Sequence, residues 1–412
     1  MAVEQAKGVR DFSASDKIIR DDLIRKLRTV FAKYGFLPLE TSLIERLDTL
    51  TAKFAAGSDS DASKEIFKII DQGERKLGLR FDLTVPLARY VAQNPNIRLP
   101  FKRYEIGRVY RDGPIKLGRY REFYQCDVDT VGVEGVEAEI ELILLALNVF
   151  HDLEVDAYIE VNDRKVLNAV LTHFKVLEKD HEEAIIIIDK LKKIGDVEVE
   201  KELKKLGVHH AKELVETLSD AEKVRKICDT SNIDKLMASM PQDKVKFTPS
   251  LARGLAYYTG IVFEGFLNNS EITSSICGGG RYDKMIGLYG EKDLCAVGIS
   301  FGLEPITEYL KIKNPQIKKT TTKVFVIPIK TFESSLKITE QIRHKGINAE
   351  VDLMGKGISK NLDYANSFEI PFVIFVGGKE LERNVIKLKD MITGKEEELS
   401  VDEAINFLKN HK

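Results

Sequence analysis

Residues 101–129, FKRYEIGRVYRDGPIKLGRYREFYQCDVD, give the clearest indication of the fold in the first part of this chain. Two segments with strand-like composition, 101–111 and 119–129, flank a short loop that contains Gly113 and Pro114. Glycine and proline interrupt regular structure, and strands joined by a short connection pair antiparallel. The sequence therefore predicts an antiparallel hairpin here.

The second strand of this hairpin has two chemically different faces, because successive side chains of a strand point to opposite sides. One face carries, in order, Arg119, Arg121, Phe123, Gln125, Asp127 and Asp129. The other face carries Tyr120, Tyr124, Cys126 and Val128, with Glu122 as its one charged member. Guanidinium groups suit phosphates, a phenyl ring can stack on a base, and carboxylates suit an ammonium or an imidazole N–H. The first face is predicted to hold a nucleotide at one end and an amino acid at the other; a solvated sheet face is the alternative.

The hairpin is locally basic within a nearly neutral chain. From Arg98 to Arg121 there are eight basic and two acidic residues, whereas the whole chain has 63 Lys and Arg against 65 Asp and Glu. This balance excludes a protein surface that is basic all over and binds nucleic acid everywhere. It is compatible with a local cationic site.

Length and composition favour a multidomain protein of the cytoplasm. With 412 residues, and about 150 residues per domain, we expect two or three domains. No apolar run approaches the roughly 18 residues of a membrane span, and the N-terminus lacks the apolar core of a signal peptide. The four cysteines form no CxxC pair, which indicates reduced thiols rather than disulfides or a zinc site.

The rest of the chain divides into segments that differ in composition and in predicted secondary structure. A helix with Ser15 as a candidate cap ends at Gly35, and a Lys- and Glu-rich helical insertion spans about 165–245. Further predicted elements are strands at 65–70, 76–80, 256–266 and 295–301, a helix at 136–150 and a linker at 311–323. Beyond the linker, strands at 324–329, 349–353 and 372–376 alternate with helices at 333–345 and 358–367, which predicts a small α/β domain with a mainly parallel sheet.

Three shorter segments add candidate ligand groups. Asp82 and Thr84 lie on one side of a strand end and could bind an amino group, although capping the helix that follows is the simpler interpretation. Arg253 precedes a glycine turn and two tyrosines. The glycine run 278–280 could let the backbone approach a ligand, and a tight turn explains it equally well.

These segments together resemble the histidyl-tRNA synthetase family, a class II aminoacyl-tRNA synthetase family. The likeness rests on LRFDLT at 79–84, YR at 110–111, GRYREFYQ at 118–125 and RGLAYYTG at 253–260, and covers nearly the whole chain. The last segment is similar to a signature specific to the histidine enzyme.

The resemblance implies an α+β catalytic domain built on an antiparallel sheet, residues 1–318, with the helical insertion at about 165–245. It also implies a C-terminal α/β domain of the anticodon-binding type, residues 322–412. A cytoplasmic homodimer is expected, with no membrane attachment. It would use ATP and Mg²⁺ to join L-histidine to tRNA(His) through a histidyl-adenylate, releasing pyrophosphate and AMP. The alternative is a catalytically weak paralogue with a regulatory or tRNA-sensing role.

The resemblance also assigns site residues. The predicted histidine-binding set is Asp82, Thr84, Arg111, Gln125, Asp129, Arg253, Tyr257 and Tyr258. The predicted ATP-binding set is Arg111, Arg119, Arg121, Phe123 and Glu304. Arg111 and Arg253 are the predicted catalytic pair, and no residue is predicted to form a metal site of the protein itself.

Two positions depart from the family pattern. Ala256 stands where the family usually has an aspartate, and Pro305 stands where the family usually has an arginine that covers the adenine. We expect either that another cation, Arg119 or Arg281, substitutes for this arginine, or that ATP binding is weakened. Residues 320–412 hold 14 basic and 14 acidic side chains, so their composition shows no electrostatic preference for RNA.

Overall fold

The computed structural model describes residues 3–52, 64–115, 120–253, 257–314 and 318–411. The chain divides into two compact units, which are Met1–Arg10 with Leu23–Lys313, and Asp11–Asp22 with Asn314–Lys412. The limits 1–318 and 322–412 given by the sequence and the resemblance stay predictions.

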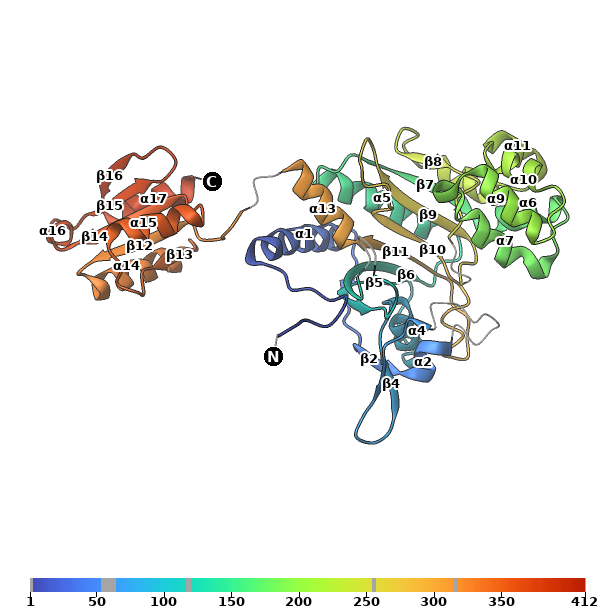
Figure 1. Cartoon of the computed structure of the whole chain (residues 1–412), viewed down its shortest axis with the longest axis horizontal. Helices are drawn as coiled ribbons and strands as arrows, with labels where there is room; N and C mark the ends of the chain where they lie inside the picture. The colour runs from blue at the N-terminus through green and yellow to red at the C-terminus, as the bar shows by residue number, and fades with distance from the viewer. Residues whose placement is uncertain (1–2, 53–63, 116–119, 254–256, 315–317, 412) are drawn as a thin grey trace. The chain divides into compact units, whose positions relative to one another are not determined.

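The first unit is built on an eight-stranded sheet (Figure 1). Its strands, in spatial order, are β1 (Leu37–Pro38), β5 (Phe101–Tyr110), β6 (Glu122–Val131), β11 (Ala296–Gly302), β10 (Cys277–Arg281), β9 (Ile261–Leu267), β7 (Ala157–Asp163) and β8 (Val245–Phe247). Neighbours pair antiparallel except at the two edges, where β1 runs parallel to β5 and β8 runs parallel to β7. The predicted α+β fold on an antiparallel sheet is thus confirmed, with two short parallel pairs at the edges.

The hairpin of β5 and β6 confirms the prediction from residues 101–129. Its register places Tyr110 opposite Glu122 and Phe101 opposite Val131. Cys126 and Val128, on the apolar face of β6, are fully buried. They share a core with Phe31 of α1 (Ala14–Lys33) and Leu142 of α5 (Glu137–Asp152). One face of the sheet is therefore core, and the other is left to carry polar groups.

The helical insertion forms its own apolar core at the end of the sheet that carries β7 and β8 (Figure 1). Its helices are α6 (Arg164–His173), α7 (His181–Ile188), α8 (Leu191–Ile194), α9 (Asp196–Lys205), α10 (Ala211–Leu218) and α11 (Ala221–Ile227). The last helix of the insertion, α12 (Ser231–Met237), packs instead into the core of the large sheet through Ile233 and Leu236. In α10, Ala211, Leu214, Val215 and Leu218 are buried at helical spacing, so one stripe of an otherwise polar helix faces this core.

A three-stranded sheet of β2 (Ile44–Arg46), β4 (Lys76–Leu79) and β3 (Lys68–Ile70) lies beside α2 (Leu47–Thr51) and α4 (Thr84–Gln93). Strands β3 and β4 lie within the ranges predicted at 65–70 and 76–80, and in the turn between them the Asp71 carboxylate accepts from the Gly73 and Arg75 N–H groups. The prediction that Ser15 caps the first helix was wrong. α1 already includes Ala14, and the Ser13 hydroxyl accepts from the Asp16 N–H.

The second unit contains a five-stranded sheet in the order β13 (Ala349–Val351), β12 (Val324–Ile329), β14 (Phe372–Gly377), β15 (Ile386–Asp390) and β16 (Glu396–Leu399). The first three strands are parallel, as predicted, and β15 and β16 add an antiparallel edge that the sequence reading missed. Its helices are α14 (Phe332–His344), α15 (Ile358–Ser367), α16 (Gly378–Glu382) and α17 (Val401–Asn410). Within the described ranges, no helix is long and apolar enough to cross a bilayer.

Candidate active site

Strand register brings polar groups into two rows on the face of the large sheet opposite the α1–α5 core. Directly paired residues of antiparallel strands share a face. One row therefore runs through Glu105, Asp127, Ser300, Gly278 and Glu264, from β5 to β9. The next row runs through Arg103, Asp129, Gly298 and Gly280. We call these two rows the polar floor.

The acidic part of the polar floor is deeply buried. Asp127 is 4% exposed and Asp129 is 2% exposed. Asp129 Oδ1 accepts a 2.5 Å hydrogen bond from the Tyr282 hydroxyl, and Asp129 Oδ2 lies 2.9 Å from Nη2 of the fully buried Arg103. Burial raises the pKa of Asp129, and burial with the nearby Asp129 charge raises the pKa of Asp127 to about 8. Of the two carboxylates, Asp129 has a guanidinium partner within the floor.

Glycines in β10 and β11 make room above the floor. A Cβ at Gly278 would lie 1.7 Å from Arg253 Nη1, and one at Gly280 would lie 3.0 Å from Tyr258 Cδ1. The interpretation of 278–280 as a tight turn was wrong, because these residues form the central strand β10. Their small size lets an arginine and a tyrosine, rather than only a ligand, approach the backbone closely.

Arg253 is held over this glycine strand with part of its hydrogen-bonding capacity unused. Its Nη1 lies 3.4 Å from Glu264 Oε1, and its Cζ lies 5.4 Å from the centre of the Tyr258 ring. Among the described residues, Nη1 has no hydrogen-bond acceptor although it is buried. Burial raises the pKa of Glu264, against the opposing effect of the Arg253 charge. A guanidinium with a buried, unused N–H is suited to an anionic ligand.

Arg111 and Phe123 meet at the loop end of the hairpin. The Arg111 Nε donates to the Phe81 carbonyl at 3.1 Å, and the Arg111 Cζ lies 4.9 Å from the centre of the Phe123 ring. The arginine is therefore fixed beside the ring, which suits one group that binds phosphate and another that stacks on a base.

Arg121 anchors the start of β6 rather than projecting freely. Its Nε donates to the Gly113 carbonyl at 3.2 Å, its Nη1 lies 3.2 Å from Asp112 Oδ1, and its own N–H donates to the Gly8 carbonyl. Arg119 lies outside the described residues.

Asp82 caps the helix, which was the simpler of the two roles that the sequence left open, and it also lies near the acidic floor. Its Oδ1 accepts from the Val85 N–H at 3.0 Å, directly before the residues of α4 that include Thr84 at its first position. Its charge also raises the pKa values of Asp127 and Asp129, after the larger effect of burial. The carboxylate therefore lies close to the floor while it caps the helix.

Gln125, Tyr257 and Tyr258 are further residues of the predicted histidine-binding set. Gln125 Nε2 donates to Ser300 Oγ at 3.3 Å, while its Oε1 is buried without a hydrogen-bond donor among the described residues. The rings of Tyr257 and Tyr258 lie 4.6 Å apart, and burial is the main cause that raises the pKa of both hydroxyls. Both tyrosines therefore stay neutral donors at neutral pH.

Pro305 and Glu304 follow the end of β11. Pro305 lies against Gly302, where an added Cβ would come within 2.8 Å of the proline Cγ. Glu304 is buried, with its Oε1 3.5 Å from the Tyr124 N–H. The space at this strand end is thus filled partly by the proline ring.

Arg281 does not substitute for the family arginine. It forms a double hydrogen bond to Glu139 at 2.7 and 2.8 Å and donates to the carbonyls of Val133 and Gly135. That expectation was wrong, because the guanidinium nitrogens already hold β10 to α5 and to the loop that precedes α5.

Sequence reasoning missed several residues of the floor, namely Arg103, Asp127, Ser300 and Glu264, and it missed Tyr282, which donates to Asp129. Asp127 lay on the correct face of its strand but was given no role. A register between 101–111 and 119–129 would have placed Arg103 opposite Asp129, whereas Tyr282 and Glu264 could not be found without the order of distant strands.

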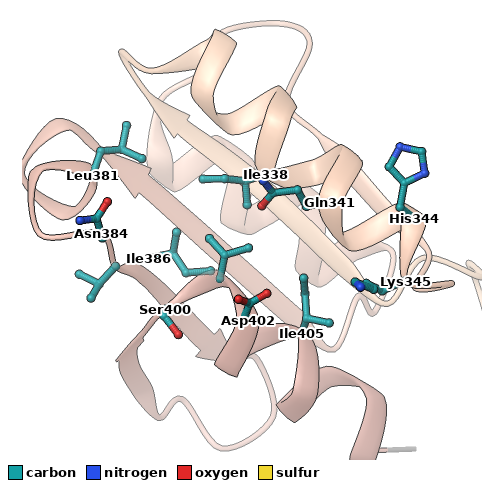
Figure 2. Close-up of a pocket in the computed structure, with 12 residues that line it drawn as sticks. Ile338, Gln341, His344, Lys345, Leu381, Asn384, Ile386, Ser400, Asp402 and Ile405 are labelled. Atoms are coloured by element: carbon teal, nitrogen blue, oxygen red, sulfur yellow. The ribbon is translucent and has the colours of Figure 1, made fainter.

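A separate cavity of about 500 Å³ lies in the second unit (Figure 2). Ile338, Ile386 and Ile405 provide apolar walls, and Gln341 and Lys345 lie at its rim. No residue of the predicted sets lines it. Among the described residues, no group of three or more His, Cys, Asp and Glu side chains is placed to hold a metal ion.

Comparison with known proteins identifies the family. The family model described as histidyl-tRNA synthetase matches residues 8–306, and the anticodon binding domain model matches residues 323–411. The chain belongs to the histidyl-tRNA synthetase family. The sequence-based assignment to this family and to its ligase class is thereby confirmed.

Full-length relatives agree with this assignment. The chain is 37% identical to histidine–tRNA ligase 1 of Bacillus anthracis over 433 aligned positions, which cover 99% of this chain and all of the relative. It is 39% identical to histidine–tRNA ligase 2 of Shouchella clausii over 415 positions, which cover 96% of this chain and 97% of the relative.

Solved structures share the fold. The histidyl-tRNA synthetase of Nostoc sp. PCC 7120 superposes with a TM-score of 0.87 at 27% identity, and each chain is covered completely. A protein of Bacillus halodurans, described as an ATP phosphoribosyltransferase regulatory subunit/histidyl-tRNA synthetase, has a TM-score of 0.76 at 21% identity, covering 90% of this chain and 97% of that one. The second likeness shows the fold alone.

Proposed function

We propose that this protein joins L-histidine to tRNA(His) by forming a histidyl-adenylate from histidine and ATP. The observation that carries the proposal is Arg253, whose buried Nη1 has an unused N–H and lies above a glycine strand beside the acidic floor. A cationic group next to acidic ones is what a site needs when it binds an amino acid and stabilises negative charge at the neighbouring phosphate.

The amino acid would bind by pairing its donors with buried acceptors. Gln125, Asp82 and Thr84 would receive the α-ammonium group, and Asp129 would receive an imidazole N–H beside Tyr257 and Tyr258. Unused polar atoms such as Gln125 Oε1 support this assignment. A site of this kind rejects side chains that lack the matching N–H groups, because its buried acceptors would then stay unpaired.

ATP would bind at the loop end of the hairpin. Phe123 would stack on the adenine, while Arg111 and Arg119 would contact phosphate oxygens. The contacts of Arg121 with Gly113 and Asp112 favour a role in shaping this loop as well as in attracting the nucleotide. Pro305 supplies no cation, so we expect weaker adenine binding than a family arginine would give.

Mg²⁺ fits this site as an ion carried by the ATP phosphates, because it is commonly held by one or two carboxylates together with phosphate oxygens. Glu304 is the carboxylate that would hold it, and the ion would neutralise charge on the leaving pyrophosphate.

The chemical step needs positioning and charge stabilisation. A histidine carboxylate oxygen attacks the α-phosphorus, a new O–P bond forms, and the bond to pyrophosphate breaks with its electron pair leaving on pyrophosphate. Arg111 and Arg253 would stabilise the developing charge, and no proton transfer is required in this step. A terminal hydroxyl of the tRNA would then attack the histidyl carbonyl and release AMP.

A cytoplasmic homodimer is part of the proposal. The anticodon-type domain would contact the tRNA, an assignment that rests on the family match rather than on surface charge. The regulatory alternative is less favoured, because the chain keeps both the double tyrosine and the C-terminal domain.

The decisive experiment is pyrophosphate exchange. Purified protein should incorporate labelled pyrophosphate into ATP when histidine is present, and should not do so with other amino acids or with none. Folded protein that shows no histidine-dependent exchange would favour the non-catalytic relative.

A further inference from the structure

Asp127 is a buried acid to which none of the roles above applies. It lies on β6 between Gln125 and Asp129 and faces Glu105 on one neighbouring strand and Ser300 on the other. Its two acidic neighbours in the floor each have a guanidinium partner. Arg80 Nη1 lies 2.7 Å from Glu105 Oε1, and Arg103 Nη2 lies 2.9 Å from Asp129 Oδ2. Within the described part of the chain, Asp127 has no ion pair at such a distance.

Two buried acceptors next to each other lack donors. Gln125 Oε1 and Asp127 Oδ1 are both buried and without a hydrogen-bond partner among the described residues. Ser300 lies close to both residues, because its Oγ accepts from Gln125 Nε2 and it is paired directly with Asp127 across β6 and β11. Buried acceptors are normally satisfied, so this pair indicates a ligand that brings N–H groups.

The charged and titratable groups around Asp127 favour a cationic ligand. They are Asp129 on its own strand, Arg103 and Glu105 on β5, Asp82 before α4, and the hydroxyls of Tyr258 and Tyr282. Carboxylates outnumber the single guanidinium in this set. The missing partner of Asp127 is therefore a positive group.

We propose that Asp127, together with Gln125, binds the α-ammonium group of the amino acid, so that Asp127 is a further substrate-binding residue of the site. This inference rests on the proposed function, since it takes histidine as the ligand. Asp127 adds a full negative charge to this subsite. The subsite otherwise consists of the Gln125 amide, the Thr84 hydroxyl and the Asp82 carboxylate, and Asp82 already caps α4.

The proposal predicts that the Asp127 carboxyl group loses its proton when histidine binds. In the free protein, burial and the Asp129 charge raise the pKa of Asp127 to about 8, so its carboxyl group holds a proton at pH 7. An ammonium group bound against it favours the carboxylate. The neutral acid then becomes a carboxylate paired with the ammonium, and its proton passes to the solvent. Histidine binding at pH 7 is expected to release up to one proton per site.

Calorimetry can measure this release. Histidine is titrated into the full-length protein at pH 7 in two buffers that differ in ionisation enthalpy, and the titration is repeated with imidazolelactate, which has a hydroxyl in place of the amine. We expect proton release with histidine and none with imidazolelactate. Equal release with both ligands, or none with either, would overturn the proposal without requiring any variant.

Asp127→Asn gives the second arm. The variant should bind histidine about 10- to 100-fold more weakly, the usual effect of losing a hydrogen bond to a charged group, and release no proton. Its affinity for imidazolelactate should be unchanged. Asp163→Asn is the matched control, because Asp163 is another buried acid of the same sheet that caps α6, and asparagine can also cap.

The outcomes separate this inference from the proposed function. Unchanged histidine affinity and proton release in Asp127→Asn would remove Asp127 from the subsite, while histidine-dependent pyrophosphate exchange by the native protein would still support the ligase. Absence of histidine binding by the native protein would instead contradict both.

Discussion

At the scale of single residues, this site depends on how buried charges are compensated. Arg103 is fully buried between Glu105 and Asp129, at 3.7 and 2.9 Å from their oxygens. A buried ion pair of this kind gains little stability, but removing one partner leaves an unpaired charge and costs about 3–5 kcal/mol. The floor is therefore preorganised at some cost, and its remaining unpaired groups are the ones that a ligand can satisfy.

Arg253→Ala tests the proposed catalytic role of Arg253. We expect pyrophosphate exchange to fall by about 10²- to 10³-fold, because a donor aimed at developing charge is lost. Histidine affinity should change by less than about threefold, if Arg253 acts, as proposed, mainly on the charge that develops at the phosphate. Steady-state exchange and equilibrium titration measure the two quantities. Similar losses in both would show that Arg253 mainly binds substrate.

Asp127→Asn should also change how stability depends on pH. The pKa of Asp127 is raised by burial, so this group costs increasing stability as pH rises from about 4 to about 8, and the cost levels off above that. Asparagine removes the cost. Without histidine, the variant should gain about 1–3 kcal/mol in free energy of unfolding relative to native protein between pH 5 and pH 8.

Urea denaturation at the two pH values measures this difference. Parallel stability profiles for the native protein and the variant would show that Asp127 is already ionised in the free site. Such a result would also remove the basis for proton release on binding.

At the scale of elements, local patterns were predictable and strand order was not. The hairpin at 101–129 could be predicted from the alternation of its two strand faces and from its glycine–proline loop. Both patterns lie within a few residues of sequence. Strand β10 could not be predicted, since three successive glycines have low strand propensity and their place between β9 and β11 depends on distant pairing. For the same reason, the sequence could not show that Tyr282 lies beside Asp129 or that Glu264 lies beside Arg253.

The glycines of β10 give a prediction at this scale. Gly278→Ala places a Cβ 1.7 Å from Arg253 Nη1, the end of a flexible side chain, so the chain can fold while the guanidinium moves. We expect pyrophosphate exchange to fall about 100-fold, as for a misplacement of about 1 Å, with a loss of stability near 1 kcal/mol. Exchange rates and thermal unfolding measure the two effects.

Two other glycine substitutions, one in β10 and one in the turn between β3 and β4, serve as comparisons. Gly279→Ala should destabilise the fold itself, because its Cβ would meet the Gly298 carbonyl oxygen at 2.0 Å. Gly73→Ala should change neither quantity, because its nearest contact, at 3.5 Å, is ordinary. Full activity in Gly278→Ala would mean that the position of Arg253 over β10 has no catalytic importance.

At the scale of the whole molecule, chemistry and tRNA selection are assigned to separate parts of the chain. The apolar cores of the C-terminal domain contain residues from Val324 to Leu408, and the core around the large sheet contains none of these. This separation could be anticipated from the linker at 311–323 and the change to alternating strands and helices. A surface that selects RNA could not be anticipated, since basic and acidic residues are equal in number beyond residue 320.

Deleting residues 320–412 tests this division of roles. The catalytic sheet and its cores stay intact, so histidine-dependent pyrophosphate exchange should remain within about tenfold of the native rate. Aminoacylation of tRNA(His) should fall by about 10³-fold or more, because the proposed anticodon contact is lost. Thermal unfolding of the truncated protein checks that the catalytic unit remains folded. Equal losses in the two reactions, with folding preserved, would mean that the C-terminal domain supports the catalytic unit instead of selecting the tRNA.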